Sequence, residues 1–456
     1  MKTDMRKTKR SLTTTQVIML GFLFTIAVGS GLLALPLSAA DGVPVPYVDA
    51  LFTATTATCV TGLVTLPTFS AWSSFGQVVI LLLIQIGGLG VVTILSGLML
   101  MFHRRIGITD RLLIQDAFNL NTMSGLVRFV KKVICGTLII EGVGALLYMI
   151  EFIPQYGVRG IWLSVFTAIS AFCNAGIDLF GADSLCRWAV HPLINAVTCG
   201  LIVLGGLGYI VWWDVLRVLR HLRTRGLRCL RELTLHSKIV LSATALLIFG
   251  GAALFLLLEW SNPLTLEGRP LWEKLQLAVF QSVTTRTAGF FTLPQKDLTD
   301  ASALLSLLLM FIGGSPVGTA GGVKTVTFAV LLAYAMSMIR GREEVGLWGR
   351  SIPRHALSKA VAVTGVSFAT MFTASLLLAA VTDAPALDIL YETVSATATV
   401  GLTRDLTPSL NVWGKLIITS TMYLGRVGPI SLAVAFNVRR KNQNSIKNPV
   451  EDISVG

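Results

Sequence analysis

Long hydrophobic runs recur along the chain, separated by shorter segments that carry most of the charged residues. A helix needs about 20 mostly apolar residues to cross the hydrocarbon core of a bilayer. Runs of that length lie at 15–38, 74–102, 126–153, 188–216, 237–260, 301–339, 357–382 and 411–437. We therefore predict eight transmembrane helices.

Four shorter apolar pieces each follow the first run of a pair. They lie at 47–58, 161–172, 271–284 and 386–397. A helix of about a dozen residues rises roughly 18 Å, which is well short of the ~30 Å core. We expect each piece to enter the membrane as a short helix and to turn back.

A glycine follows each short piece, and the spacing of these glycines is nearly constant. Gly62, Gly176, Gly289 and Gly401 are separated by 114, 113 and 112 residues. The predicted fold class is an all-α integral membrane protein with four parallel helix–re-entrant loop–helix repeats around one axis. The repeats span 15–102, 126–222, 236–339 and 357–437, between an N-terminal segment at 1–14 and a tail at 438–456.

Composition supports a membrane location. Hydrophobic residues make up 53% of the chain and charged residues 13%, whereas soluble domains average about 25% charged residues. Basic loops stay on the cytoplasmic side of a membrane, so both termini are predicted to be cytoplasmic and the glycine segments to open outward. The net charge of +13 is then a topology signal rather than a sign of nucleic-acid binding. Of the 37 Lys and Arg residues, 27 lie in alternate polar segments, at 1–14, 103–132, 217–238, 340–359 and 438–456.

Few residues offer enzyme chemistry. The six cysteines lack metal-ligand or paired spacing, and the five histidines lie in loops or near helix ends. We predict no enzyme activity, no metal-ligating side-chain cluster and no required disulfide. A secondary transporter with a midplane site would show inverted repeats and coupling carboxylates, whereas these repeats run parallel and Glu141 is the one evident mid-span carboxylate.

The glycine segments point to cation binding. Non-helical backbone is tolerated at membrane depth only where protein or water satisfies it, and glycine most easily reaches the angles that turn successive carbonyls toward one axis. A ring of carbonyls can replace the water around a cation. The candidate ion-binding residues are Val60, Thr61, Gly62, Asn174, Ala175, Gly176, Thr287, Ala288, Gly289, Thr399, Val400 and Gly401.

The same segments carry a family resemblance. ATCVTGL at 57–63, SAFCNAG at 170–176, TRTAGF at 285–290 and ATVGL at 398–402 resemble the four filter segments of the Trk/Ktr/HKT superfamily of potassium transporters. The resemblance covers nearly the whole chain. Because the chain starts at its first repeat, without two additional leading helices, it is most similar to the Ktr-type membrane subunits (KtrB).

The resemblance implies potassium uptake across a bacterial plasma membrane, with one filter glycine per repeat. In some plant members a serine at the position of Gly62 shifts the preference toward sodium, so transport of sodium or of monovalent cations with less selectivity is the alternative. Cys173 and Arg404 depart from the family pattern. The implied partners are a second copy of this chain and a cytosolic KtrA-type subunit that binds ATP or ADP. No cofactor is expected in this chain, and sodium is left open as an activator.

The sixth run is unusually long and contains a glycine-rich segment. Residues 313–322 hold five glycines and a proline, and a helix does not persist through such a segment. In the resembling family a loop at this place acts as a gate. Lys324 is interpreted as a cation that closes this gate or anchors the loop or, alternatively, as a simple interfacial anchor. The candidate gate residues are Gly313, Gly314, Gly318, Gly321, Gly322 and Lys324.

Arg426 breaks the fourfold pattern. Glycine pairs recur after the filter glycines of the first three repeats, but the aligned position in the fourth repeat is Arg426. An arginine in mid-membrane costs ~2.5–3.5 kcal/mol on insertion scales, so it is expected to face a cavity or a partner. Two interpretations stay open: a salt bridge to an acidic residue such as Glu141, or an electrostatic barrier in the pore.

Overall fold

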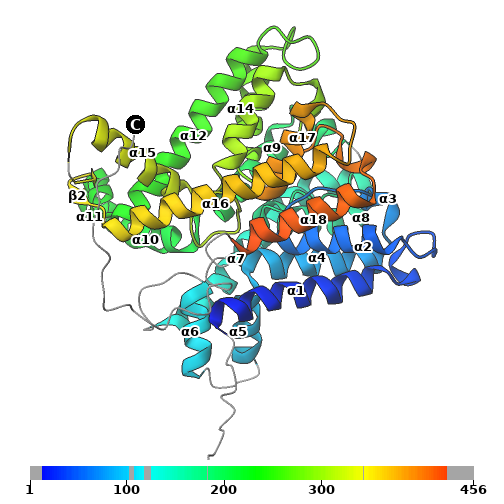
Figure 1. Cartoon of the computed structure of the whole chain (residues 1–456), viewed down its shortest axis with the longest axis horizontal. Coiled ribbons are helices and arrows are strands. Elements are labelled where there is room, and N and C mark those ends of the chain that lie inside the picture. The colour runs from blue at the N-terminus through cyan, green and yellow to red at the C-terminus, as the bar shows by residue number, and fades with distance from the viewer. Residues whose placement is uncertain (1–12, 102–106, 118–124, 182, 343, 429–456) are drawn as a thin grey trace, which may run out of the picture.

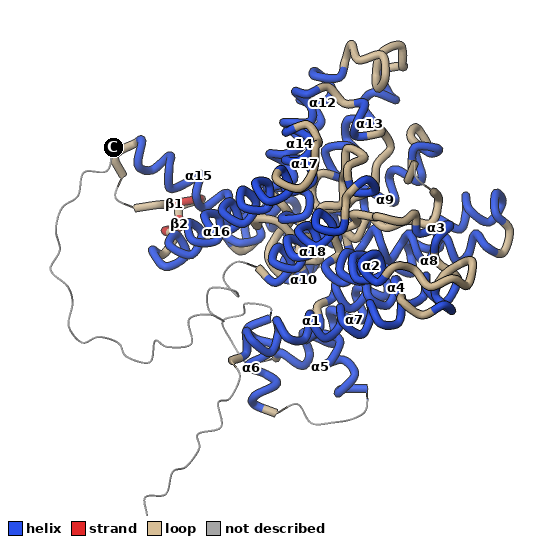
Figure 2. The backbone as a smooth tube through the Cα atoms, turned by 45° about the vertical axis from the view of Figure 1, so that its right-hand side comes forward, coloured by secondary structure: helices blue, strands red, loops and turns tan. Residues whose placement is uncertain are grey.

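The structure is a computed structural model that describes residues 13–101, 107–117, 125–181, 183–342 and 344–428. Helices form nearly all of its regular structure, with one short hairpin at an edge (Figure 2). The first repeat contains α1 (Thr14–Leu33), α2 (Tyr47–Cys59), α3 (Thr68–Ala71), α4 (Ser74–Leu89), α5 (Val91–Met101) and α6 (Ile108–Ala117). The second contains α7 (Leu126–Tyr156), α8 (Arg159–Cys173), α9 (Pro192–Leu207), α10 (Tyr209–Leu219) and α11 (Leu222–Arg225).

The second half of the chain follows the same order. The third repeat contains α12 (Leu235–Glu259), α13 (Leu271–Thr284), α14 (Asp300–Phe311) and α15 (Thr325–Ile339). The hairpin of β1 (Gly346–Leu347) and β2 (Arg350–Ser351) leads to α16 (Arg354–Ala379), α17 (Ala386–Ala398) and α18 (Val412–Val427). Short 3-10 helices lie at Pro36–Ser38, Cys186–Trp188, Gly226–Glu232, Gln295–Asp297 and Thr407–Ser409.

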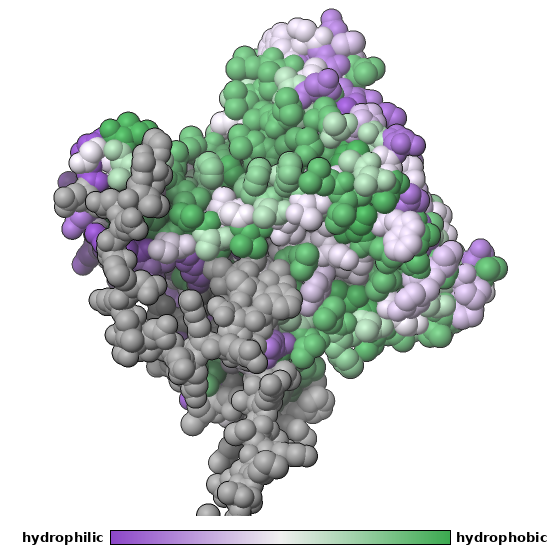
Figure 3. Space-filling view, in the orientation of Figure 1, coloured by the Kyte–Doolittle hydropathy of each residue, from purple (hydrophilic) through white to green (hydrophobic). Residues whose placement is uncertain are grey.

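The long helices that open the repeats are the clearest membrane spans. Among the described residues, four helices are long and apolar enough to cross a bilayer, namely α1, α7, α12 and α16. Their exposed faces are rich in leucine and phenylalanine. Figure 3 shows hydrophobic surface over the middle of this view, with hydrophilic residues along its edges.

The second helices of the first two repeats differ from the predicted runs, because they do not continue straight. The α4–α5 pair bends by 97° and the α9–α10 pair by 100°. The bends lie at Gly90 and Gly208, whose φ values of 86° and 87° are in the left-handed region that favours glycine. Gly428, at the end of α18, has the same φ of 87°. The end of the eighth predicted run, at 429–437, lies outside the described residues.

The short helices α2, α8, α13 and α17 form a closed ring of contacts. Each packs against the long first helix of its own repeat and against the second helix of the preceding repeat. These neighbours along the chain are α4 with α8, α9 with α13 and α14 with α17, and α18 closes the ring on α2. Figure 1 shows α18 from the end of the chain beside α2 from its start.

Glycines let the second helices approach the ends of the short helices. A Cβ built on Gly87 would lie under 3.0 Å from the carbonyl oxygen of Thr58. The same is true of Gly205 with the oxygen of Phe172, and of Gly425 with that of Thr397. Each of these carbonyls belongs to the residue four positions before Gly62, Gly176 or Gly401. Gly87, Gly205 and Gly425 are therefore a packing requirement of this ring of helices.

Two glycines of α9 provide a direct test of this requirement. Gly205→Ala should destabilise the protein by about 1–3 kcal/mol, because the new methyl group meets backbone that cannot rotate away. Gly200→Ala, on the same helix, is the matched control, since a Cβ there has nothing within 4 Å. Thermal unfolding of the purified protein in detergent would measure both. Equal melting temperatures for the two variants would contradict the packing requirement.

Candidate functional site

The four segment glycines meet at the centre of the ring of short helices. Gly62, Gly176, Gly289 and Gly401 have φ values of 101°, 66°, 82° and 95°. A Cβ on Gly62 would lie 3.2 Å from the Cα of Gly401 and 3.3 Å from that of Gly176. A Cβ on Gly176 would lie 2.5 Å from the Cα of Gly289, and one on Gly289 3.5 Å from that of Gly401. These four residues, called here the glycine ring, leave no room for side chains.

Backbone carbonyls converge on the glycine ring. The oxygen of the residue before each glycine lies under 3.0 Å from where a Cβ of a neighbouring glycine would be. The pairs are Ala175 with Gly62, Ala288 with Gly176, Val400 with Gly289 and Thr61 with Gly401. Carbonyl oxygens carry partial negative charge, so this arrangement suits a cation stripped of water.

Hydroxyl groups of the short helices hold the segments in place, and sequence reasoning did not identify them. Thr56 Oγ1 accepts the amide N–H of Gly62 at 3.0 Å, and Ser395 Oγ accepts that of Gly401 at 3.0 Å. In the other two repeats the hydroxyl donates to the carbonyl of the residue after the glycine. Ser170 Oγ donates to Ile177 O at 2.6 Å, and Thr284 Oγ1 donates to Phe290 O. The signal was present, because a Ser or Thr precedes every ring glycine by five or six residues.

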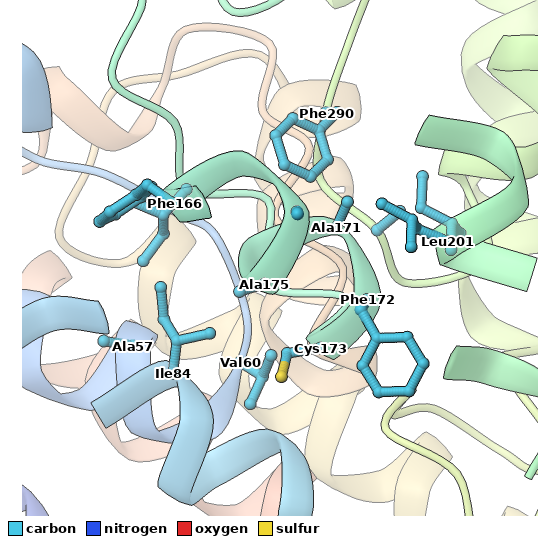
Figure 4. Packing of buried hydrophobic residues seen from close by; sticks show 14 of the residues in the cluster. Ala57, Val60, Ile84, Phe166, Ala171, Phe172, Cys173, Ala175, Leu201 and Phe290 are labelled. Carbon is cyan, nitrogen blue, oxygen red and sulfur yellow. The ribbon is translucent and has the colours of Figure 1, made fainter. Parts of the chain in front are cut away.

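The other candidate ion-binding residues are buried around the glycine ring. Val60, Asn174, Thr287 and Thr399 have positive φ values between 52° and 65°. Three of them directly follow α2, α8 and α17, whereas Thr287 lies three residues beyond the end of α13. Figure 4 shows Val60 beside Cys173, and Ala175 where its segment follows α8. Among the described residues, Thr61, Asn174 and Thr399 have buried side-chain polar atoms without a hydrogen-bond partner.

The chain between α14 and α15 forms a non-helical loop against the glycine-ring segments. Thr319 joins it to the second repeat, because its N–H donates to Gly205 O at 3.1 Å and its hydroxyl to Phe172 O at 3.0 Å. Ser315 N–H donates to Gly206 O at 2.8 Å, and Gly321 N–H donates to Thr287 Oγ1 at 3.2 Å. The loop therefore contacts the ends of α8 and of the third glycine segment.

Glycines also set the close packing of this loop, called here the α14–α15 loop. A Cβ on Gly318 would lie 2.8 Å from Gly205 O, and one on Gly314 3.1 Å from Gly206 O. Gly322 has a φ of 67°. Gly313 N–H donates to Val323 O at 3.0 Å, so the two ends of the loop pair with each other.

Arg426 joins the α14–α15 loop to the first repeat. Its Nη1 donates to Thr319 O and its Nη2 donates to Gly87 O, each at 2.6 Å. Glu141 does not pair with it; that carboxylate accepts a hydrogen bond from Gln85 Nε2 at 3.1 Å and lies 3.7 Å from Cys173 Sγ. The interpretation of Arg426 as the partner of Glu141 is therefore wrong. An arginine can form two parallel hydrogen bonds, and here both reach backbone carbonyls.

Two further positions singled out in the sequence have identifiable partners. Lys324 Nζ donates to Ala320 O at 2.6 Å, so this amine bonds within the α14–α15 loop. Arg404 Nε donates to Asp388 at 2.7 Å, and its guanidinium also approaches Asp300 at 4.0 Å. Arg404 is thus engaged by carboxylates at the start of α17 and α14, away from the glycine ring.

Comparisons with known proteins bear on the chemistry of this site. A family model described as TrkH, cation transport protein, matches residues 4–448. The potassium/sodium uptake protein NtpJ of Enterococcus hirae is 38% identical over 457 residues, which cover 99% of each chain. The Ktr system potassium uptake protein B of Bacillus subtilis is 38% identical over 442 residues, covering 97% of this chain and 96% of the relative.

A solved structure shows the fold. The potassium transporter TrkH from Vibrio parahaemolyticus superposes with a TM-score of 0.74 at 15% identity, covering 95% of this chain and 86% of the other. The helical architecture of the chain is thus that of TrkH, in agreement with the resemblance of the glycine segments.

The hydroxyl bonds of the glycine segments can be tested on α2. Thr56→Val removes the acceptor of the Gly62 amide at nearly constant volume, and we expect a loss of about 1 kcal/mol in stability. The ratio of K⁺ to Na⁺ flux in proteoliposomes should also fall, because the segment loosens. Thr53→Val is the control, since the buried Thr53 hydroxyl has no partner among the described residues. An identical flux ratio in both variants would argue against a positioning role for Thr56.

Proposed function

The chain belongs to the TrkH family of cation transport proteins, and we propose that it takes up potassium through the glycine ring. As a member of this family it is a multi-pass membrane transporter and not an enzyme. Homologous proteins are potassium uptake transporters by name. The eight-helix arrangement with cytoplasmic termini, in the bacterial plasma membrane, belongs to the same proposal.

The convergence of four backbone carbonyls at the glycine ring is the observation that carries this function. The oxygens of Thr61, Ala175, Ala288 and Val400 each belong to a different repeat. Such a ring replaces the hydration shell of a monovalent cation without a charged side chain, so the ion binds and also leaves. Gly62 keeps the first segment free of a side chain, which favours potassium over sodium.

Transport of sodium or less selective cation transport is the second candidate. One observation favours it: a relative that is 38% identical over nearly its full length is named a potassium/sodium uptake protein. The two candidates differ in the flux ratio of K⁺ to Na⁺.

We assign the α14–α15 loop the role of a gate and Arg426 the role of a barrier. The loop lies across the ends of α8 and the third glycine segment, where an ion leaving the ring would pass. Arg426 adds a positive charge at this place and holds Thr319 O. Lys324, bonded to Ala320 O, contributes a second positive charge to the closed loop.

Regulation is assigned to a partner. One relative is named as protein B of a Ktr system, which accords with a membrane subunit that works with other subunits. We propose a homodimer bound to a cytosolic subunit of the KtrA type, with ATP or ADP on that subunit, and leave sodium as an optional activator.

Gly62→Ser tests the assigned ion path. The added side chain enters a ring in which a Cβ at this position already lies 2.5 Å from Ala175 O. We expect the K⁺ to Na⁺ permeability ratio in proteoliposomes to fall at least severalfold. Growth of a potassium-uptake-deficient bacterium at low potassium should fall with it. A variant that folds and keeps the original ratio would refute the assignment of the glycine ring as the filter.

Arg426 variants test the barrier. Arg426→Ala should raise maximal potassium uptake severalfold, because it removes both the positive charge and the bond to the loop. Arg426→Lys keeps the positive charge but cannot form both hydrogen bonds of the guanidinium group. Low uptake in this variant would indicate that the charge is the barrier. Raised uptake would indicate that Arg426 acts by bonding the loop to the first repeat. Arg350→Ala, at an exposed position, controls for the change in net charge. Lower uptake by a folded Arg426→Ala protein would contradict both roles.

A further inference from the structure

A groove of about 390 Å³ runs between α12 and α15 and shares no lining residue with the glycine ring. It is lined by the first half of α12 and by α15, with the hairpin at one end. Its apolar part includes Leu246, Phe328 and Leu332, which are 70%, 37% and 51% exposed. At least a third of each of these side chains is left exposed by the described part of the chain.

The length of the groove matches one leaflet of a bilayer. On α12 the lining extends from Ile239 to Leu247, a rise of ~12 Å at 1.5 Å per residue. On α15 it extends from Thr325 to Arg340, a rise of ~22 Å. Half of a ~30 Å hydrocarbon core is about 15 Å, so an acyl chain of one leaflet fits along these helices.

One end of the groove is basic and aromatic. Arg340 and Arg342 line it together with Trp348, which lies at the turn between β1 and β2 and is 56% exposed. Neither arginine forms an ion pair with any described residue. Glu344 is exposed and lies outside the lining. Tryptophan concentrates at the headgroup level of membranes, and this segment is one of those that the charge pattern assigns to the cytoplasm.

We propose that this groove binds an anionic phospholipid of the cytoplasmic leaflet. The headgroup phosphate lies between the guanidinium groups of Arg340 and Arg342, and one acyl chain follows α15 toward Phe328. Basic pockets between membrane helices on the cytoplasmic side are suited to anionic headgroups. Two guanidinium groups favour a lipid with net negative charge over a zwitterionic one, and the apolar length favours a lipid over free phosphate.

The bound lipid acts on the loop through α15. Thr325, the first residue of α15, lines the groove and also donates its N–H to Gly314 O at 3.0 Å. Its hydroxyl bonds to that of Ser315 at 3.0 Å. A lipid that orders α15 therefore stabilises one position of the α14–α15 loop. This regulatory part rests on the proposed function, whereas lipid binding itself does not.

Native mass spectrometry of the full-length protein tests the binding. The probes are phosphatidylglycerol and phosphatidylcholine with identical acyl chains. We expect phosphatidylglycerol to bind more tightly, and the double variant Arg340→Gln/Arg342→Gln to weaken its binding roughly 10- to 30-fold, at ~1 kcal/mol per basic residue. Arg350→Gln/Arg354→Gln is the matched control, because both residues are exposed basic residues of the same segment outside the lining.

Four results would overturn the binding proposal. One is equal affinity for the two lipids, and another is an equal loss of binding in the control variant. The third is dissociation of an oligomer by Arg340→Gln/Arg342→Gln, which would assign the groove to a second copy of the chain. A Leu332→Trp variant, which fills the apolar part, should weaken lipid binding while both arginines remain, and unchanged binding would place the lipid elsewhere.

Potassium flux in proteoliposomes tests the regulatory part separately. Vesicles of phosphatidylcholine with and without phosphatidylglycerol should give different maximal fluxes for the original protein, and the difference should shrink at least threefold in Arg340→Gln/Arg342→Gln. Lost binding with an unchanged lipid effect would overturn the coupling and leave the binding site standing. If no vesicle shows potassium flux, the proposed function fails, and the mass spectrometry still decides whether the lipid binds.

Discussion

The rest of the structure depends on one steric constraint, namely that four backbone segments meet where no side chain fits. Each ring glycine adopts a positive φ, and a Cβ on any of them would press on the backbone of a neighbouring repeat. Because no side chains pack at this junction, neighbouring groups must hold the four segments in position. Hydroxyls of the short helices bond to the segments, and the glycines of the second helices bring those helices against the short ones. The fourfold repeat is thus the simplest way to build one crowded centre from one chain.

Beneath this common plan, each interface between repeats is closed by different groups. Between the first and second repeats, Gln85 Nε2 donates to Glu141, and Cys173 Sγ donates to Gln85 Oε1. The α14–α15 loop bonds to the second repeat through Thr319, and Arg426 of the fourth repeat reaches Gly87 of the first. The backbone ring keeps near-fourfold symmetry because the four glycines approach one another too closely for any side chain, whereas the side of the ring that faces the loop differs between repeats. On that side a single loop, from the third repeat, contacts the ends of the segments.

Recurrence along the sequence predicted the parts of the fold that every repeat needs. The predicted short helix at 271–284 coincides with α13, and the other three differ from α2, α8 and α17 by at most two residues at an end. The bends at Gly90 and Gly208 were not predicted, because a glycine within an apolar run leaves its hydropathy almost unchanged. The partners of Arg426 were also missed. A sequence identifies carboxylates as candidate partners, but which backbone carbonyls remain unpaired depends on how a non-helical loop folds.

The hydrogen bonds of the α14–α15 loop limit how it can open. The backbone N–H groups of Gly313, Ser315, Thr319 and Gly321 all donate hydrogen bonds. The first bonds to the other end of the loop, whereas the other three bond to acceptors outside it. A buried polar group that loses its hydrogen-bond partner costs about 1–3 kcal/mol of free energy. Moving the loop without water would break several of these hydrogen bonds at once, and their costs would add. Water can replace these partners, as it does for non-helical backbone that lines a cavity in other membrane proteins. In the proposed gate, opening of the loop and wetting of the space beside it would therefore be one event, which Arg426 would oppose through its hydrogen bonds to Thr319 O and Gly87 O.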